Sequence, residues 1–287
     1  MTGAVPTAVL LASCPDRQGI VAAVTRFIAD RHGNIVALEQ HVARDEAAFF
    51  MRVEFELDGF AVAPEAFADA FGPVARAFDM SWKLSLAAQR QRMALFVTRE
   101  SHCVYDILAR HQAGEWAVDI PVVVANHDAL RPVAERFGIP FHVFPISAET
   151  KASQEARELE LLRDQRIDFV VLARYMQIVS ADFIRHYPNR IVNIHHSFLP
   201  AFAGAKPYHA AHERGVKIIG ATSHYVTAEL DRGPILEQDI IRVSHKDTVE
   251  DMIRKGRDNE KVVLARAIRA HIEHRILVHG NRTVVFG

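Results

Sequence analysis

Residues 47–57 alternate between apolar and polar side chains, a period of two that predicts a half-buried β-strand. Three further strands are expected at residues 7–12, 34–45 and 80–86. Apolar residues at helical spacing predict one helix after the turn at residues 14–19 and a second helix that starts at Pro64. The resulting order, β-α-β-β-α-β, is the ferredoxin-like arrangement of a small α/β domain.

A different pattern follows residue 92, in which short apolar runs alternate with helical segments. This alternation predicts βαβ units, and therefore a Rossmann-like, mostly parallel sheet covered by helices on both faces. The apolar runs lie at residues 94–98, 118–126, 141–144, 169–173 and 191–194.

The last part of the chain is expected to add two longer strands, at residues 215–225 and 235–243. A final helical region should start near Thr248 and be interrupted at Gly256, because glycine weakens a helix interior. An edge strand is expected at residues 283–286.

The polar segment 87–92 (AAQRQR) separates the two patterns and is interpreted as a linker. The predicted domains are therefore residues 1–86 and 93–287. A chain of 287 residues with 49% hydrophobic content is long and apolar enough for two cores.

Charge and cysteine content exclude several classes of function. A formal net charge of -1, from 34 basic and 35 acidic residues, offers no patch for nucleic acid or an anionic membrane, so a small molecule is the expected partner. Cys14 and Cys103 are too few for a disulfide framework, and a reducing cytoplasm is expected. Residues 11–14 resemble the end of a lipoprotein signal, but no basic residue precedes them, and we interpret them as strand. No apolar run is long enough to span a membrane.

The stretch 191–234 carries the candidate chemistry. Asn193 and His195 are two residues apart on the predicted strand and therefore share one face near its carboxyl end, where open parallel α/β sheets bind ligands. Asp231 follows in a Leu-Asp-Arg-Gly-Pro turn. Each of the three alone is best explained as a structural residue, but together and in this order they indicate an active site.

The N-terminal pattern, with the segment CPDRQGIVAAVTRFI, resembles the ACT family of regulatory domains. The resemblance implies pairing into a homodimer or homotetramer and an amino-acid effector near Asp16, Arg17 and Gly19. An alternative is that Asp16 only caps the helix and Gly19 only permits its tight entry.

Residues 92–275 resemble the folate-dependent formyltransferase family. The resemblance rests on Asn193-Ile194-His195, Ser197-Phe198-Leu199-Pro200, Gly204, His224 and the Leu230–Pro234 turn. The segments HHSFLPAF and PYH, together with the ACT-like domain, point to the formyltetrahydrofolate deformylase branch. That branch hydrolyses 10-formyltetrahydrofolate to formate and tetrahydrofolate, balancing one-carbon pools for purine synthesis, and needs no cofactor.

The resemblance assigns a catalytic triad to Asn193, His195 and Asp231. Donors from Asn193 and His195 would stabilise the charge that forms on the formyl oxygen, and Asp231 would accept a proton from water or orient it. His224 and His196 would support the triad.

The resemblance also implies a pterin pocket beside the triad. It would be formed after the strand at residues 169–173, by Arg174, Tyr175 and Met176, and by the loop that contains Thr227, Glu229 and Leu230. Tyr175 and Met176 can equally be packing residues.

The turn at residues 98–103 decides the acceptor. An enzyme that transfers formyl to glycinamide ribonucleotide would have a glycine-rich, phosphate-binding turn here, whereas this chain has no glycine and an anionic Glu100. Water is then the remaining acceptor. Transfer to another amine, and a sensor that binds an amino acid and folate without turnover, remain the alternatives.

Sixteen histidines raise the question of a metal site. The pairs His209/His212 and His271/His274 have a helical spacing of three, but neither has an evident third ligand. We expect surface histidines and no metal, with His209 near the mouth of the active site.

Overall fold

The computed structural model describes residues 5–200 and 207–287, and the chain divides into two compact units. The first unit comprises residues 1–90, 273–279 and 284–287, and the second comprises residues 91–272 and 280–283. The predicted limits were 1–86 and 93–287, so the main boundary falls inside the predicted linker. The C-terminal segments differ, because they belong mostly to the first unit.

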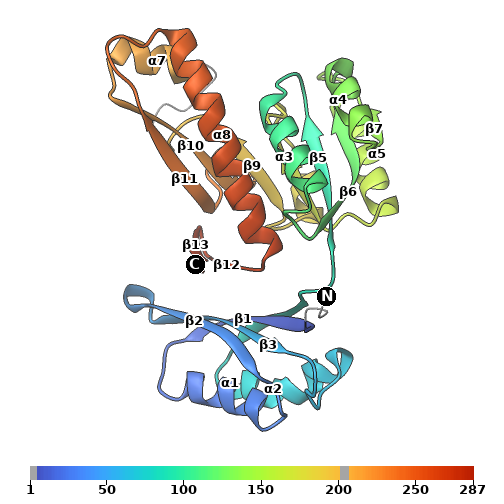
Figure 1. Cartoon of the computed structure of the whole chain (residues 1–287), viewed down its shortest axis with the longest axis vertical. Helices are drawn as coiled ribbons and strands as arrows, with labels where there is room; N and C mark the ends of the chain where they lie inside the picture. The colour runs from blue at the N-terminus through green and yellow to red at the C-terminus, as the bar shows by residue number, and fades with distance from the viewer. Residues whose placement is uncertain (1–4, 201–206) are drawn as a thin grey trace. The chain divides into compact units, whose positions relative to one another are not determined.

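The first unit has the predicted βαββαβ order. Its four-stranded antiparallel sheet has the strand order β2-β3-β1-β4, and both helices lie on one face of this sheet (Figure 1). The elements are β1 (Thr7–Pro15), α1 (Ile20–Ala29), β2 (Ile35–Ala43), β3 (Ala48–Glu56), α2 (Phe67–Ala77) and β4 (Ser81–Leu86), with short 3-10 turns at Arg44–Glu46 and Pro64–Ala66.

Alternating apolar and polar side chains on β3 were expected to give one buried and one exposed face, and only the apolar face is as expected. Phe49, Met51, Val53 and Phe55 are buried in the core between sheet and helices. On the opposite face Arg52 is also buried, because its guanidinium donates to the backbone oxygen of His274 and pairs with Glu54.

The C-terminal tail explains this burial within the first unit. Its two short strands, β12 (Ile276–His279) and β13 (Arg282–Val285), pair with each other, so the predicted tail strand exists but extends neither larger sheet. Phe286 packs into a second apolar cluster with Val9, Leu11 and Phe50 on this face of the sheet.

The second unit is built on a seven-stranded sheet of order β11-β10-β9-β8-β5-β6-β7. Strands β5 to β9 are parallel, and β10 and β11 are antiparallel, which confirms the mostly parallel sheet. The strands are β5 (Gln91–Val97), β6 (Val118–Ala125), β7 (Phe141–Val143), β8 (Phe169–Leu172), β9 (Ile191–His195), β10 (Ile218–Tyr225) and β11 (Ile235–Arg242).

Helices connect these strands, as the alternating pattern predicts. They are α3 (His102–Gln112), α4 (Arg131–Arg136), preceded by a 3-10 turn at Asp128–Leu130, α5 (Lys151–Asp164), α6 (Ala181–His186), α7 (Pro207–Arg214) and α8 (Val249–Ile272).

The predicted interruption at Gly256 is wrong, because α8 is continuous over 24 residues. A Cβ at position 256 would lie only 2.0 Å from the hydroxyl oxygen of Tyr208. Glycine is therefore explained by the close approach of α7 to α8, and not by a break in the helix.

Two further expectations concern the whole chain. Both cysteines are free and buried. Among the described residues, no helix combines the length and the apolar character that a membrane span requires.

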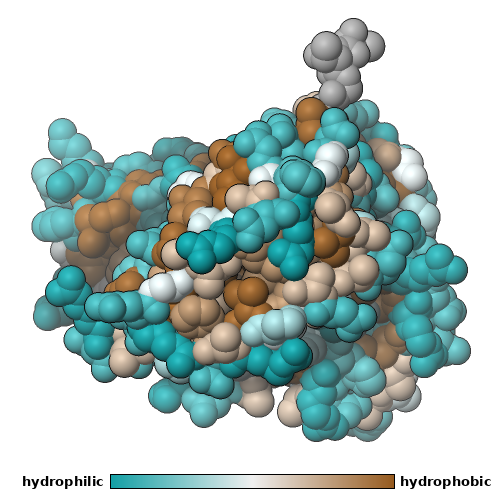
Figure 2. Space-filling view, turned by 90° about the horizontal axis from the view of Figure 1, so that it is seen from below, coloured by the Kyte–Doolittle hydropathy of each residue, from teal (hydrophilic) through white to brown (hydrophobic). Residues whose placement is uncertain are grey.

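Figure 2 shows one face of the molecule, on which hydrophilic residues predominate and hydrophobic residues form smaller patches.

Glu158 is a buried carboxyl in the core of the second unit. It lies on α5, is fully buried, and accepts a hydrogen bond of 3.1 Å from the hydroxyl of Tyr175. Burial, opposed by this hydrogen bond, raises the pKa of Glu158 from its ordinary 4.5 to about 7. The unfolded chain therefore loses this proton at lower pH than the folded protein does.

Replacement of Glu158 by glutamine is expected to stabilise the protein at pH 8 and to leave its stability at pH 4 unchanged. Below pH 4.5 the carboxyl is protonated in both states; between 4.5 and 7 stability falls as pH rises, and above 7 the loss is constant, at most about 3 kcal/mol. Urea unfolding at both pH values measures the difference. Glu160→Gln, on the exposed side of α5, is the control, and an equal effect from both variants would contradict this explanation.

Candidate active site

A cavity of about 750 Å³ lies where the parallel strands β8 and β9 end, at the predicted edge of the sheet. All its lining residues belong to the second unit. The walls come from the segment after β8, from β9 and the residues that follow it, and from the loop between β10 and β11. The lining residues are Arg174 to Ile178, Asn193 to His196, Leu199, Pro200, Leu230 to Gly233, Ile235 and Asn281.

Asn193 and His224 are paired across neighbouring strands, because Asn193 on β9 lies opposite His224 on β10. The two nitrogens, Asn193 Nδ2 and His224 Nε2, are 3.2 Å apart. His224 Nδ1 lies 2.9 Å from the carbonyl oxygen of Tyr225, which can only accept, so Nδ1 carries a hydrogen. In neutral His224, Nε2 then accepts from Asn193, whose amide keeps a second hydrogen for a ligand.

Asp231 lies between two imidazoles. Its Oδ1 atom is 3.3 Å from His195 Nδ1 and 3.7 Å from His224 Nε2. The hydrogen bond from His195, together with the neighbouring His224 ring, lowers the pKa of Asp231 well below its usual range, despite partial burial. Asp231 is therefore ionised at neutral pH. The structure thus brings together the three residues of the predicted triad and the supporting His224.

The two ring nitrogens of His195 differ in their contacts. Nδ1 faces Asp231, whereas Nε2 is buried and has no hydrogen-bond partner within residues 5–200 and 207–287. The adjacent His196 is also buried, with its ring centroid 5.3 Å from that of His195 and 6.0 Å from that of Tyr208. Burial, together with the charge of Arg174, lowers the pKa of His196 to about 4, so this imidazole is neutral at pH 7.

Apolar side chains surround the polar centre of the cavity and remain exposed. Met176, Ile178 and Leu230 are 57%, 59% and 60% exposed, values that mark a surface for an apolar ligand. Thr227 and Glu229 line a smaller cavity of about 50 Å³, which shares Asn193, Leu230 and Asp231 with the larger one.

Arg174, Tyr175 and Met176, the residues predicted to follow β8 in the pterin pocket, differ in how far their side chains are buried. The Tyr175 side chain is 2% exposed, packs edge-to-face on Phe96 and donates to Glu158, so the packing interpretation holds for its ring. Met176 is exposed. Arg174 is mostly buried, and its Nε atom lies 3.5 Å from Glu260.

Three residues of the cavity wall have left-handed backbone conformations that side chains other than glycine rarely adopt. The φ angles are 61° for Arg174, 56° for Met176 and 55° for Asp231. Such strain persists where the surrounding structure fixes the residue, and it occurs often at functional sites.

Other functional groups were not predicted from sequence. Leu199, Pro200, Ile235 and Asn281 line the cavity. Leu199 and Pro200 belong to the Ser197–Pro200 motif, so the sequence could have indicated them. Asn281 lies between β12 and β13, far along the chain from the other lining residues, and no sequence motif marks it. Gly204 of the quoted motif lies outside the described residues.

The effector turn of the first unit differs in part from the sequence interpretation. Gly19 is the N-cap of α1 with φ 91°, and no side chain caps this helix, so the proposed capping role of Asp16 is wrong. Gly19 does permit the tight entry. The Arg17 guanidinium donates to the carbonyl of Ala77 and lies 3.3 Å from Asp79.

The two histidine pairs differ in their exposure to solvent. His209 and His212 are exposed on α7, as expected, but His209 does not line the described cavities. His271 and His274 are partly buried, so the prediction of surface residues is wrong for them. His271 Nδ1 lies 2.7 Å from the Tyr225 hydroxyl, and burial lowers the pKa of His274 to about 4.

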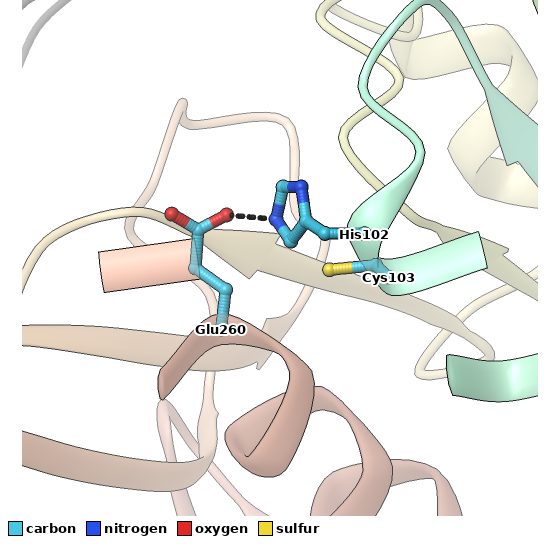
Figure 3. A group of neighbouring side chains, drawn as sticks. All are labelled: His102, Cys103 and Glu260. Atoms are coloured by element: carbon cyan, nitrogen blue, oxygen red, sulfur yellow. Dashed lines mark hydrogen bonds and ion pairs between the residues drawn. The ribbon is translucent and has the colours of Figure 1, made fainter. Parts of the chain in front are cut away.

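In the turn at residues 98–103, His102 and Cys103 lie beside Glu260 of α8. His102, Cys103 and Glu260 bring a nitrogen, a sulfur and an oxygen within 4.8 Å of one another (Figure 3). Glu100 pairs with Arg257 at 2.7 Å. Carboxylates thus stand at the start of α3, an arrangement that disfavours a phosphate there.

Comparisons with known proteins agree with this geometry. The family model described as formyl transferase matches residues 91–268, and the ACT domain model matches residues 8–68. The second unit is therefore a formyl transferase domain, joined to an ACT domain.

Relatives that match the whole chain define the group more narrowly. A formyltetrahydrofolate deformylase from Synechocystis sp. is 53% identical, over 98% of both chains. The crystal structure of a formyltetrahydrofolate deformylase from Pseudomonas syringae pv. tomato has a TM-score of 0.97 at 48% identity, over 100% of this chain and 96% of that chain. The chain belongs to the formyltetrahydrofolate deformylase family.

A transformylase structure matches about two thirds of this chain. The structure of glycinamide ribonucleotide transformylase 1 from Symbiobacterium toebii has a TM-score of 0.66 at 32% identity, and the match covers 69% of this chain and 95% of that chain.

Proposed function

We propose that this protein hydrolyses 10-formyltetrahydrofolate to formate and tetrahydrofolate, with Asn193, His195 and Asp231 as the catalytic residues. One observation carries the proposal. His195 is oriented by Asp231 through Nδ1, its Nε2 has no hydrogen-bond partner among the described residues, and the residue lines a cavity large enough for a pterin. Family membership supports the substrate.

His195 acts first as general base and then as general acid. With Nδ1–H donating to ionised Asp231, Nε2 of the neutral ring is a base that takes a proton from the attacking water. The water oxygen bonds to the formyl carbon, the C–N bond breaks, and the proton passes from His195 to the departing nitrogen. The second water proton leaves with the formic acid product, which ionises to formate.

Asp231 orients and does not act as the base. Its lowered pKa makes it a weak proton acceptor at neutral pH, but its charge stabilises the imidazolium that His195 becomes. From the sequence, Asp231 was expected to accept a proton from water or to orient that water; we propose instead that it orients His195.

Asn193 stabilises the developing oxyanion. Its amide is fixed by His224, and its second hydrogen is free to donate to the formyl oxygen as negative charge builds there. The neutral His196 beside His195 adds no competing positive charge. These groups supply donors and a base without further chemistry, so we propose that hydrolysis needs neither cofactor nor metal.

The folate would occupy the apolar part of the cavity. Met176, Ile178 and Leu230 offer a surface for the flat pterin ring, and the backbone near Thr227 and Glu229 offers polar contacts.

Release of formate without an added amine tests the function. Purified protein supplied with 10-formyltetrahydrofolate is expected to form formate and tetrahydrofolate in equal amounts, with or without a chelator. Transfer of labelled formyl to an added amine would instead support a formyltransferase. Tight folate binding by calorimetry without formate would support the sensor.

The ACT domain suggests regulation. We propose that an amino acid binds near Asp16, Arg17 and Gly19, and that the protein is a cytoplasmic homodimer or homotetramer. The edge strand β2 supports pairing, because Val36 and Leu38 on it are 49% and 37% exposed. Light scattering that found a monomer would contradict the assembly.

A further inference from the structure

We propose that Glu260 is a positioning residue whose carboxylate holds the Arg174 guanidinium in the cavity wall, where Arg174 forms the subsite for the carboxylate of formate. The inference rests on the proposed function, because formate is the product of that reaction. It adds two residues to the chemistry of the site: one that contacts the product and one that acts through it.

Glu260 is the hub of a buried polar network. It lies on α8, is 1% exposed, and receives groups from three other segments. His102 Nε2 on α3 and the Tyr208 hydroxyl on α7 are each 2.8 Å from its carboxylate oxygens, and Arg174 Nε is 3.5 Å away. Figure 3 shows the His102 contact at the start of α3. One carboxylate thus fixes the relative positions of several segments of the second unit.

The Glu260 carboxyl is ionised. Burial alone would raise its pKa, but the hydrogen bonds from His102 and Tyr208 and the charge of Arg174 outweigh burial and lower it. A buried charge of this kind is stable only when it is paired and hydrogen-bonded. His102 and Tyr208 are therefore held to Glu260 by hydrogen bonds, and Arg174 is held by its charge.

A metal site is the alternative explanation of the same side chains, since Cys103 completes a possible ligand set with His102 and Glu260. The network disfavours a cation. Both carboxylate oxygens already accept hydrogen bonds, and the Arg174 guanidinium lies 3.5 Å from one of them. Burial also raises the pKa of the Cys103 thiol well above its usual range, which opposes the thiolate that a metal requires.

Arg174 connects this network to the active site. It lines the same cavity as His195 and His196, and its positive charge contributes to the lowered pKa of His196. Arg174 Nε lies 3.5 Å from Glu260 as an ion pair without a hydrogen bond, and within residues 5–200 and 207–287 the two terminal nitrogens make no hydrogen bond. Arg174 also has a left-handed backbone, with φ 61°, a conformation that persists only where the surrounding structure fixes the residue.

The free edge of a guanidinium matches a small carboxylate. Two parallel N–H donors bind the two oxygens of a carboxylate in a fork, which a point charge cannot do. Formate is the anion that the reaction produces in this cavity. Arg174 would therefore bind formate as it forms, and it would do so only while Glu260 fixes its other edge.

The test uses the full-length protein and sodium formate as the probe. Wild type is expected to show product inhibition by formate. In Glu260→Gln the inhibition constant for formate should rise at least about tenfold, and kcat should fall about tenfold or more, while KM for the formyl folate changes little. Glu250→Gln, exposed at the start of the same helix, is the control and should behave as wild type.

Arg174→Ala keeps the test valid if Glu260→Gln folds poorly. It should weaken formate inhibition to the same extent, and added guanidinium ion should restore part of kcat when Glu260 is present but not in the double variant. The two substitutions should be strongly non-additive in formate inhibition, because Glu260 acts through Arg174.

Two outcomes would overturn the inference. One is an active wild-type enzyme that formate does not inhibit. The other is an active pair of variants with wild-type formate inhibition, or with additive effects and no guanidinium rescue. Neither outcome affects the proposed function, which fails only if wild type releases no formate.

Discussion

Replacement of Asp231 by asparagine is expected to lower the rate of formate release by about two to four orders of magnitude, while folate binding remains measurable. Asparagine has the same shape, and it tolerates the left-handed backbone at this position, where φ is 55°. What is lost is the negative charge that holds the hydrogen of His195 on Nδ1. An amide can present its NH2 group to Nδ1 and so move that hydrogen to Nε2, which leaves no base facing the substrate.

Single-turnover formate release and folate titration by fluorescence measure the two effects separately. Thermal unfolding is the control for folding, and a lower but still cooperative transition is expected, because the ionised carboxylate interacts favourably with His195. Wild-type turnover in Asp231→Asn would exclude the proposed orienting role.

Replacement of Gly233 by alanine is expected to lower kcat/KM by about a hundredfold or more, through displacement of the turn that carries Asp231. A Cβ at this position would lie 1.7 Å from the carbonyl oxygen of Tyr225 and 3.3 Å from Thr227. No Cβ fits at that distance, so the turn must move away from the end of β10. Asp231 is only two residues away and would move with it, out of reach of His195.

Steady-state kinetics and urea unfolding measure this result, and overpacking of this kind is expected to cost about 1–3 kcal/mol in stability. Gly72→Ala is the matched control, because its added Cβ would meet only the flexible end of the Arg76 side chain, at 3.1 Å. It should leave kcat/KM unchanged. Equal losses in the two variants would show that the effect is not specific to the turn.

The fold could be predicted in large part because the hydrophobic pattern repeats locally. The alternation on β3 and the strand–helix order after residue 92 each depend on neighbours within a few residues, and both are confirmed. The prediction at Gly256 was wrong for the opposite reason. The glycine is required by Tyr208, a residue 48 positions earlier in the chain, and intrinsic helix propensity carries no information about that contact.

The sequence by itself determined the two-domain α/β organisation and the family, and it predicted Asn193, His195 and Asp231 as the catalytic residues, because strand period, turn chemistry and motif order depend on short stretches of sequence. Only the tertiary structure supports the roles that we propose for each of these residues. Three features depend on which groups meet in a buried, low-dielectric site: the distance from His195 to Asp231, the lack of a partner for His195 Nε2 within residues 5–200 and 207–287, and the lowered pKa of Asp231. The Glu260–Arg174 contact belongs to the same category, because it joins residues 86 positions apart, and only folding brings them together.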